Sequence, residues 1–165
     1  MKKQIPYIGL LIALAFILSY LESCIPFTLG IPGVKLGLAN LVVLVAIYTT
    51  NYRIAFGVSV LRIVLAGFTF GNLFSMWFAL AGGILSFLIM MIMKKTGKFS
   101  PVGVSVSGAV SHNIGQLFVA ICVVESTSIV YYLPVLLLSG TIAGTLIGLL
   151  GGLLIQRLER IKVFK

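Results

Sequence analysis

The amino-acid sequence predicts an all-α integral membrane protein, a bundle of six transmembrane helices with both chain ends in the cytoplasm. The 165-residue chain is 60% hydrophobic and only 9% charged, with a mean hydropathy of +1.20. It therefore has too little polar surface to cover a soluble protein of its size. Long stretches are apolar on every face, as helices in lipid are. The basic residues lie in short clusters between these stretches, which is typical of membrane topology signals.

The first two helices are expected at residues 6–22 and 35–50. Lys2 and Lys3 precede the first apolar run as they would in a signal peptide, but no small-residue cleavage site leads into a polar domain. We therefore expect this helix to stay attached. The connection at 23–34 is apolar despite its two prolines and two glycines. It is predicted to fold over the helix ends as a lid or a partly re-entrant cap, with an interfacial linker as the alternative.

The remaining helices are expected at 52–70, 73–94, 101–123 and 131–157, and all six helices form one domain, 1–165. Each stretch approaches the roughly 20 apolar residues that a hydrocarbon core of about 30 Å requires. Glycines recur every four residues along the last helix and form a smooth stripe. These are Gly140, Gly144, Gly148 and Gly152. The stripe predicts close packing within the bundle or, alternatively, docking of a partner subunit.

Most of the twelve basic residues fall on one side of this arrangement. By the positive-inside rule that side is cytoplasmic, so both termini lie inside and the helix count is even. Topology thus accounts for the net charge of +9 better than nucleic-acid binding does. The residues on this side are Lys2, Lys3, Arg53, Lys94, Lys95, Lys98, Arg157, Arg160, Lys162 and Lys165.

A few ionisable and amide side chains at membrane depth mark the candidate binding site, because such groups normally face the bundle interior or a wet cavity. Arg62 and His112 are each about ten residues from the inner end of their helices, which places both roughly 15–17 Å from that boundary. Other polar residues approach the same outer half of the bundle. They are Lys35, Asn40, Asn72, Asn113 and Gln116. This cluster predicts a site for an anionic or strongly polar small molecule that enters from outside.

Each of these residues also has a structural interpretation. Arg62 can brace the bundle through helix-end carbonyls, and the polar residues of the fifth helix can form interhelical hydrogen bonds. No negative group is expected beside the cluster, since the chain contains no aspartate and only three glutamates. Of these, Glu22 lies near the first loop, where a surface pair with Lys35 is its structural interpretation.

Several signatures are absent from the sequence. It contains no GxxxxGK[ST] phosphate loop, so an ATP-driven step requires another subunit. Cys24 and Cys122 lie outside any CxxC or Cys/His cluster, which argues against a metal site or redox motif. We therefore expect no catalytic residue, metal or cofactor, and no enzymatic activity of the chain itself.

Three segments carry a family resemblance: Pro32-Gly-Val-Lys-Leu-Gly-Leu-Ala-Asn40, Ala81-Gly-Gly-Ile-Leu-Ser86 and the run from Ser100 to Gln116. Over nearly its whole length the chain resembles the Gx transporter family, often labelled heptaprenyl diphosphate synthase component I. That family is similar to the substrate-binding S components of energy-coupling factor (ECF) transporters.

The resemblance implies a six-helix S component in the bacterial cell membrane. Such a protein captures a vitamin-like molecule beneath the first loop, then docks on a transmembrane coupling subunit driven by two ATPase subunits. Small residues on the first helix form the docking face of S components, and Gly9, Ala13 and Ala15 are the matching positions here.

The enzyme label supports an alternative function, an accessory membrane component of prenyl diphosphate or menaquinone biosynthesis whose basic cytoplasmic ends recruit a soluble enzyme. Prenyl diphosphate synthases hold magnesium through aspartate-rich motifs, and a chain without aspartate cannot be that catalyst alone. A scaffold without a ligand is a third possibility. The charges of Arg62, Lys35 and His112 suit a diphosphate or a carboxylate, so flavin-related and isoprenoid- or quinone-related ligands both remain open.

Overall fold

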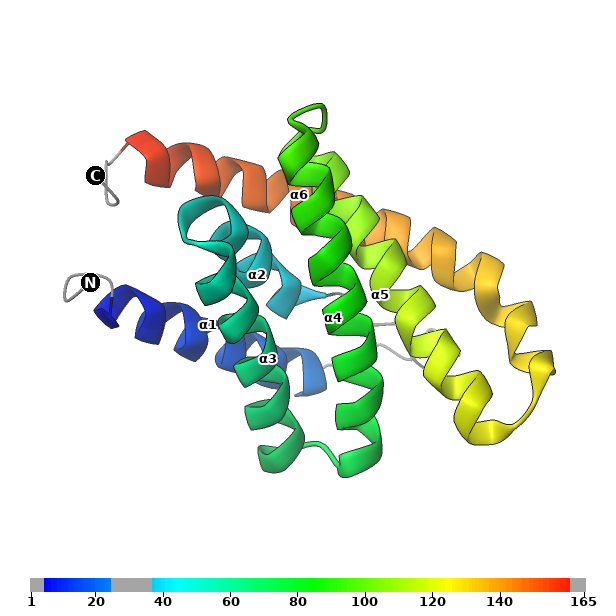
Figure 1. The fold of residues 1–165 in the computed structure, drawn as a ribbon. Coiled ribbons are helices and arrows are strands. Elements are labelled where there is room, and N and C mark those ends of the chain that lie inside the picture. The colour runs from blue at the N-terminus through cyan, green and yellow to red at the C-terminus, as the bar shows by residue number, and fades with distance from the viewer. Residues whose placement is uncertain (1–4, 25–36, 161–165) are drawn as a thin grey trace.

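Within its described residues the chain folds into six α-helices that run back and forth past one another (Figure 1). The computed structural model describes residues 5–24 and 37–160. The helices are α1 (Ile5–Cys24), α2 (Leu38–Thr49), α3 (Tyr52–Thr69), α4 (Leu73–Thr96), α5 (Pro101–Val124) and α6 (Leu133–Arg160), with a short 3₁₀-helix, η1 (Thr127–Tyr132), before the last. Their ends lie within three residues of the ranges expected from the sequence. The lid expected at 23–34 falls almost wholly outside the described residues.

Local sequence determines where α4 and α5 begin and end. The Asn72 side chain accepts a hydrogen bond from the Ser75 backbone N–H at 2.7 Å, and the Ser75 hydroxyl accepts one from the Asn72 N–H at 3.0 Å. This reciprocal pair is a capping box. Gly97 ends α4 with a φ of 66°, a conformation that glycine adopts without steric cost. Pro101 then occupies the start of α5, where its missing N–H is not needed.

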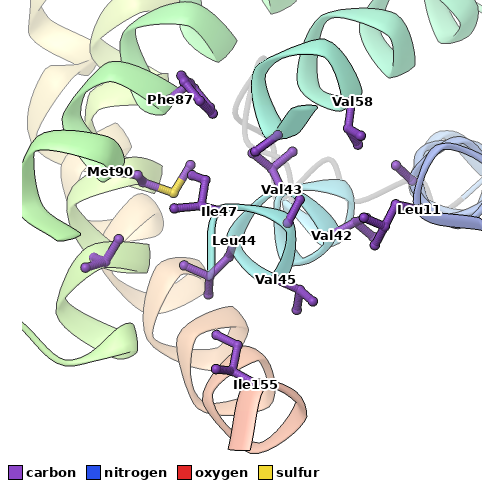
Figure 2. Packing of buried hydrophobic residues seen from close by; sticks show 14 residues of the cluster. Leu11, Val42, Val43, Leu44, Val45, Ile47, Val58, Phe87, Met90 and Ile155 are labelled. Carbon is purple, nitrogen blue, oxygen red and sulfur yellow. The ribbon is translucent and has the colours of Figure 1, made fainter. Parts of the chain in front are cut away.

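The short helix α2 lies at the centre of the bundle and contacts all five other α-helices. Its consecutive residues Val42 to Ile47 are all buried, although they point to every side of the helix. Figure 2 shows these side chains packed among residues such as Leu11 of α1, Val58 of α3 and Ile155 of α6. A helix that is apolar on every side needs apolar surroundings, and for α2 the other helices of the bundle provide them.

Five helices are long and apolar enough to cross a membrane: α1, α3, α4, α5 and α6 together with η1. They carry large apolar side chains on their outer faces, such as Leu10, Ile17 and Leu153, which suit contact with lipid. The chain is therefore a multi-pass membrane protein. The expectation of six full-length spans differs at α2, whose 12 residues extend about 18 Å, well short of a hydrocarbon core of about 30 Å.

Glycines allow α5 to approach both of its neighbours closely. A Cβ atom on Gly144 would lie 2.7 Å from Val106 Cα, and one on Gly148 would lie 2.7 Å from Val102 Cα. The glycine stripe of α6 thus faces α5, as its packing interpretation predicted. Partner docking on this stripe is excluded over these positions, because α5 already covers them.

Basic side chains gather where α2, α3 and α4 meet. Lys94 Nζ donates a hydrogen bond to the Ile47 carbonyl oxygen at 2.6 Å and lies over the rings of Tyr48 and Tyr52, 4.8 and 5.1 Å from their centroids. Figure 1 shows the start of α1 and the end of α6 on one side of the molecule. We refer to the side of the molecule that holds Lys94 as the basic end.

Candidate binding cavity

A cavity of about 400 Å³ opens between the helices on the side away from the basic end. This volume lies within the range of about 300–1,000 Å³ that is usual for small-molecule sites. All six helices contribute residues to its wall. Six of the seven residues expected to bind a ligand line it: Asn40, Arg62, Asn72, His112, Asn113 and Gln116. The seventh, Lys35, lies outside the described residues.

Arg62 projects from the middle of α3 into this cavity and is only 8% exposed. Its Nη2 atom donates a hydrogen bond to Asn40 Oδ1 at 2.7 Å, which fixes the guanidinium against the start of α2. Its Nε atom is buried and has no hydrogen-bond partner among the described residues. The cavity wall therefore contains a fixed positive charge, one of whose N–H donors is unpaired within the described structure.

His112 and Arg62 both line the cavity, and two adjacent glycines of α4 contact the segments that carry them. Gly82 of α4 lets α5 approach so closely that a Cβ there would lie 2.7 Å from the His112 carbonyl oxygen and 2.9 Å from Gln116 Cγ. A Cβ on the next residue, Gly83, would lie 2.6 Å from Cδ1 of Ile63, the residue that follows Arg62. Adjacent positions on α4 thus lie against both the α5 segment of His112 and the α3 segment of Arg62.

Two of the expected binding residues also have structural roles. Asn113 Nδ2 donates a hydrogen bond to the Leu136 carbonyl oxygen of α6 at 2.7 Å. Its amide joins α5 to α6, as the interhelical interpretation predicted. Asn72 caps α4 at the exposed mouth of the cavity. These two amides therefore shape the wall in addition to facing the cavity.

The sequence predicted no negative group near this cluster. That prediction is wrong, because Glu22 at the end of α1 lines the cavity. Its Oε1 atom accepts a hydrogen bond from the backbone N–H of Gly37 at 2.5 Å, and its carboxylate interacts electrostatically with Arg62. The described lining residues thus carry one fixed positive and one negative charge. Any pair of Glu22 with Lys35 lies outside what the structure describes.

The floor of the cavity lies deeper in the bundle, toward the basic end. It combines the apolar side chains of Met90 and Ile147 with the hydroxyl-bearing residues Ser86 and Ser105. The missing side chain at Gly108 of α5 lets Met90 and Ser86 of α4 pack directly against that position, since a Cβ there would lie 2.6 Å from Met90 Cγ and 3.2 Å from Ser86 Oγ. The floor therefore combines apolar surface with hydroxyl groups.

One aromatic ring, that of Phe70, lines the cavity near its mouth. It packs against Phe16 and Tyr20 of α1, with centroid distances of 5.5 and 5.6 Å. Phe68 and Phe74, near the same ends of α3 and α4, are 73% and 68% exposed and point outward. Among the residues that the structure describes, a single aromatic ring therefore contributes to the site.

The small residues of α1 do not share one face. Gly9 and Ala13 are exposed, whereas Ala15 is fully buried in the core cluster around α2. This corrects the expected docking surface, because Ala15 is already covered by the protein's own helices. Gly9 and Ala13 remain available to a neighbouring subunit.

Sequence reasoning did not assign Glu22, Ser86 or Ser105 to the site. Glu22 was expected near the first loop, but it lies in the last turn of α1, which continues to Cys24. Ser86 had a detectable signal, since it is the polar residue in the middle of an otherwise apolar run that follows two glycines. No group of His, Cys, Asp and Glu in the described parts of the chain could hold a metal ion. The size and polar lining of the cavity suit the binding of a small molecule.

The family model described as heptaprenyl diphosphate synthase component I matches residues 11–154. This range includes every residue that lines the cavity. No curated protein and no solved structure matches the chain.

Proposed function

The chain belongs to the heptaprenyl diphosphate synthase component I family, and from this premise we propose that it is the substrate-binding subunit of an energy-coupling factor type transporter. It captures a small molecule with an anionic group from outside the cell and presents it to partner subunits that drive uptake with ATP. A membrane-embedded chain with a cavity of small-molecule size suits this role.

The observation that carries the proposal is the buried Arg62 side chain in the cavity wall, whose Nε donor has no hydrogen-bond partner among the described residues. A buried guanidinium is costly unless negative charge and hydrogen bonds compensate it. Asn40 supplies a neutral acceptor on one side of Arg62. An anionic group of the ligand is expected to accept a hydrogen bond from Arg62 Nε. The oxygen atoms of carboxylates and phosphates match the paired N–H donors of an arginine guanidinium.

The partners follow from what the sequence lacks. The chain has no phosphate-binding loop, so ATP hydrolysis belongs to separate ATPase subunits, and a transmembrane coupling subunit connects them to the cavity protein. Gly9 and Ala13 offer small, exposed positions on α1 against which a helix of that coupling subunit can pack. The expected location is the cell membrane of a bacterium.

Native mass spectrometry of the full chain, purified in detergent from its host, tests this function. The wild-type protein is expected to retain a stoichiometric anionic compound. Arg62→Ala is expected to weaken binding at least about tenfold and so to lower the retained fraction, because a hydrogen bond to a charged group contributes about 1.5–3 kcal/mol. Arg53→Ala is the matched control, since Arg53 is an exposed arginine on the same helix and does not line the cavity. Equal retention by the two variants would contradict the proposal.

The family description favours a second candidate, an accessory membrane component of prenyl diphosphate or menaquinone biosynthesis. In that function the basic end recruits a soluble synthase, which supplies the magnesium-binding acidic groups that a chain without aspartate lacks. Co-purification of a prenyl synthase with an empty cavity, and loss of that synthase's activity when the chain is deleted, would favour this candidate over transport.

A further inference from the structure

Ser86 has a hydroxyl group that the fold leaves unsatisfied. The residue is 1% exposed, lines the cavity floor, and its Oγ atom has no hydrogen-bond partner within the described structure. Leaving a buried polar group unpaired costs about 1–3 kcal/mol. Such a group is therefore normally satisfied by protein, water or ligand.

Other hydroxyl groups in these helices show how a serine is usually satisfied. The Ser107 hydroxyl donates to the Gly103 carbonyl at 2.8 Å, and the Ser111 hydroxyl donates to the Ser107 carbonyl at 2.7 Å. Both bonds reach four residues back along the helix, as is common for serine in apolar helices. Ser86 makes no such bond, although it lies in the middle of α4.

The position of Ser86 relative to Arg62 defines two polar points in one cavity. Gly83 is level with the Arg62 region through its contact with Ile63. Ser86 is three residues further along α4 and so lies about 4.5 Å closer to the basic end. The Arg62 guanidinium is hydrogen-bonded to Asn40 at the start of α2. The cavity wall around these two points holds apolar side chains such as Ile63 and Ile147 as well as the polar side chain of His112.

We propose that Ser86 Oγ binds a polar atom in the body of the ligand while Arg62 binds its acid group. The ligand is then a compact acid whose ring or chain carries a hydrogen-bonding atom, and not an acid or diphosphate on a pure hydrocarbon chain. This inference rests on the proposed binding function and names its substrate class. It also adds Ser86 as a specificity-determining residue, because a hydrocarbon group against this hydroxyl would leave the hydroxyl unpaired.

A matched pair of probes tests the inference: indole-3-acetate, which has a ring N–H, and 1-naphthaleneacetate, which has a hydrocarbon ring system of similar size. Affinities of the full chain in detergent are measured by titration in native mass spectrometry. Indole-3-acetate is expected to bind the wild type about tenfold more tightly. Ser86→Ala is expected to abolish this preference. Ser107→Ala, which removes a hydroxyl already bonded to backbone outside the cavity lining, is expected to keep it.

Equal affinities in the wild type would mean that water satisfies Ser86, and would overturn the inference. A preference that survives in Ser86→Ala, or binding of neither acid, would overturn it as well. These outcomes differ from failure of the proposed function. If Arg62→Ala loses the retained compound while the probe pair shows no discrimination, the transport proposal stands and only the role of Ser86 fails.

Discussion

Replacement of Gly148 by alanine is expected to destabilise the bundle, because the new methyl group has no space. Its Cβ would lie 2.7 Å from Val102 Cα and 3.0 Å from Ser105 Cβ on α5. Favourable carbon–carbon contacts are about 3.5–4.0 Å, so α5 and α6 must separate locally by about 1 Å. Overpacking of this kind costs about 1–3 kcal/mol, and the higher helix propensity of alanine returns up to about 1 kcal/mol. The expected net loss in free energy of unfolding is about 1–2 kcal/mol.

Gly152 provides the matched control on the same stripe, one turn further along α6. A Cβ there would meet only Pro101 Cβ, at an ordinary contact distance of 3.8 Å. Gly152→Ala is therefore expected to be neutral or to stabilise the protein by up to about 1 kcal/mol. Both variants are compared with the wild type by thermal unfolding of the full chain in the same detergent, and circular dichroism monitors the loss of helix.

The melting temperature is expected to fall for Gly148→Ala and to stay equal or rise for Gly152→Ala. If the two variants melt together, the close approach of α5 and α6 does not depend on the missing side chain at Gly148. The steric argument for the whole stripe would then be refuted, since Gly144 makes an equivalent approach to Val106.

Two further predictions concern charge. Glu22→Gln keeps an acceptor for the Gly37 N–H but removes a negative charge that interacts with Arg62. Indole-3-acetate is therefore expected to bind this variant a few-fold more tightly than the wild type. Weaker binding in the same titration would contradict this electrostatic role. Lys94→Ala removes a charged hydrogen bond to the end of α2 and two contacts with aromatic rings. Lys95→Ala removes one ring contact at 5.5 Å. The melting temperature is therefore expected to fall further in Lys94→Ala than in Lys95→Ala. Equal melting temperatures for the two lysine variants would contradict that difference.

The positions of the helices could be read from the sequence because apolar runs and their polar breaks are strong signals. Asn72, Gly97 and Pro101 mark helix ends by local chemistry that the structure reproduces. Whether protein or lipid surrounds a helix could not be read from the sequence. Hydropathy treats the run from Val42 to Ile47 as it would a lipid-facing span, although these residues are buried in protein. Composition cannot distinguish an apolar helix enclosed by other helices from one enclosed by lipid.

The candidate site was predictable where an ionisable group lies deep in an apolar helix, as Arg62 and His112 do. It was less predictable at the helix ends, where Glu22 resembles an ordinary interfacial residue in the sequence. Ser86 was missed for another reason, since serine is common in membrane helices and usually bonds to its own backbone. Only the three-dimensional structure shows that its hydroxyl is left unpaired in a cavity.

The short length of α2 explains how an acidic and a basic residue share one cavity. Because α2 extends only about 18 Å from the basic end, its first turn stops inside the bundle, where Gly37 and Asn40 line the cavity. A helix N-terminus carries partial positive charge from its free N–H groups. Glu22 takes the Gly37 N–H, so its charge is balanced by the helix start as well as by Arg62. The Arg62 Nε donor has no partner among the described residues. An added anion meets positive potential from the arginine and from the start of α2, reduced by the negative charge of Glu22.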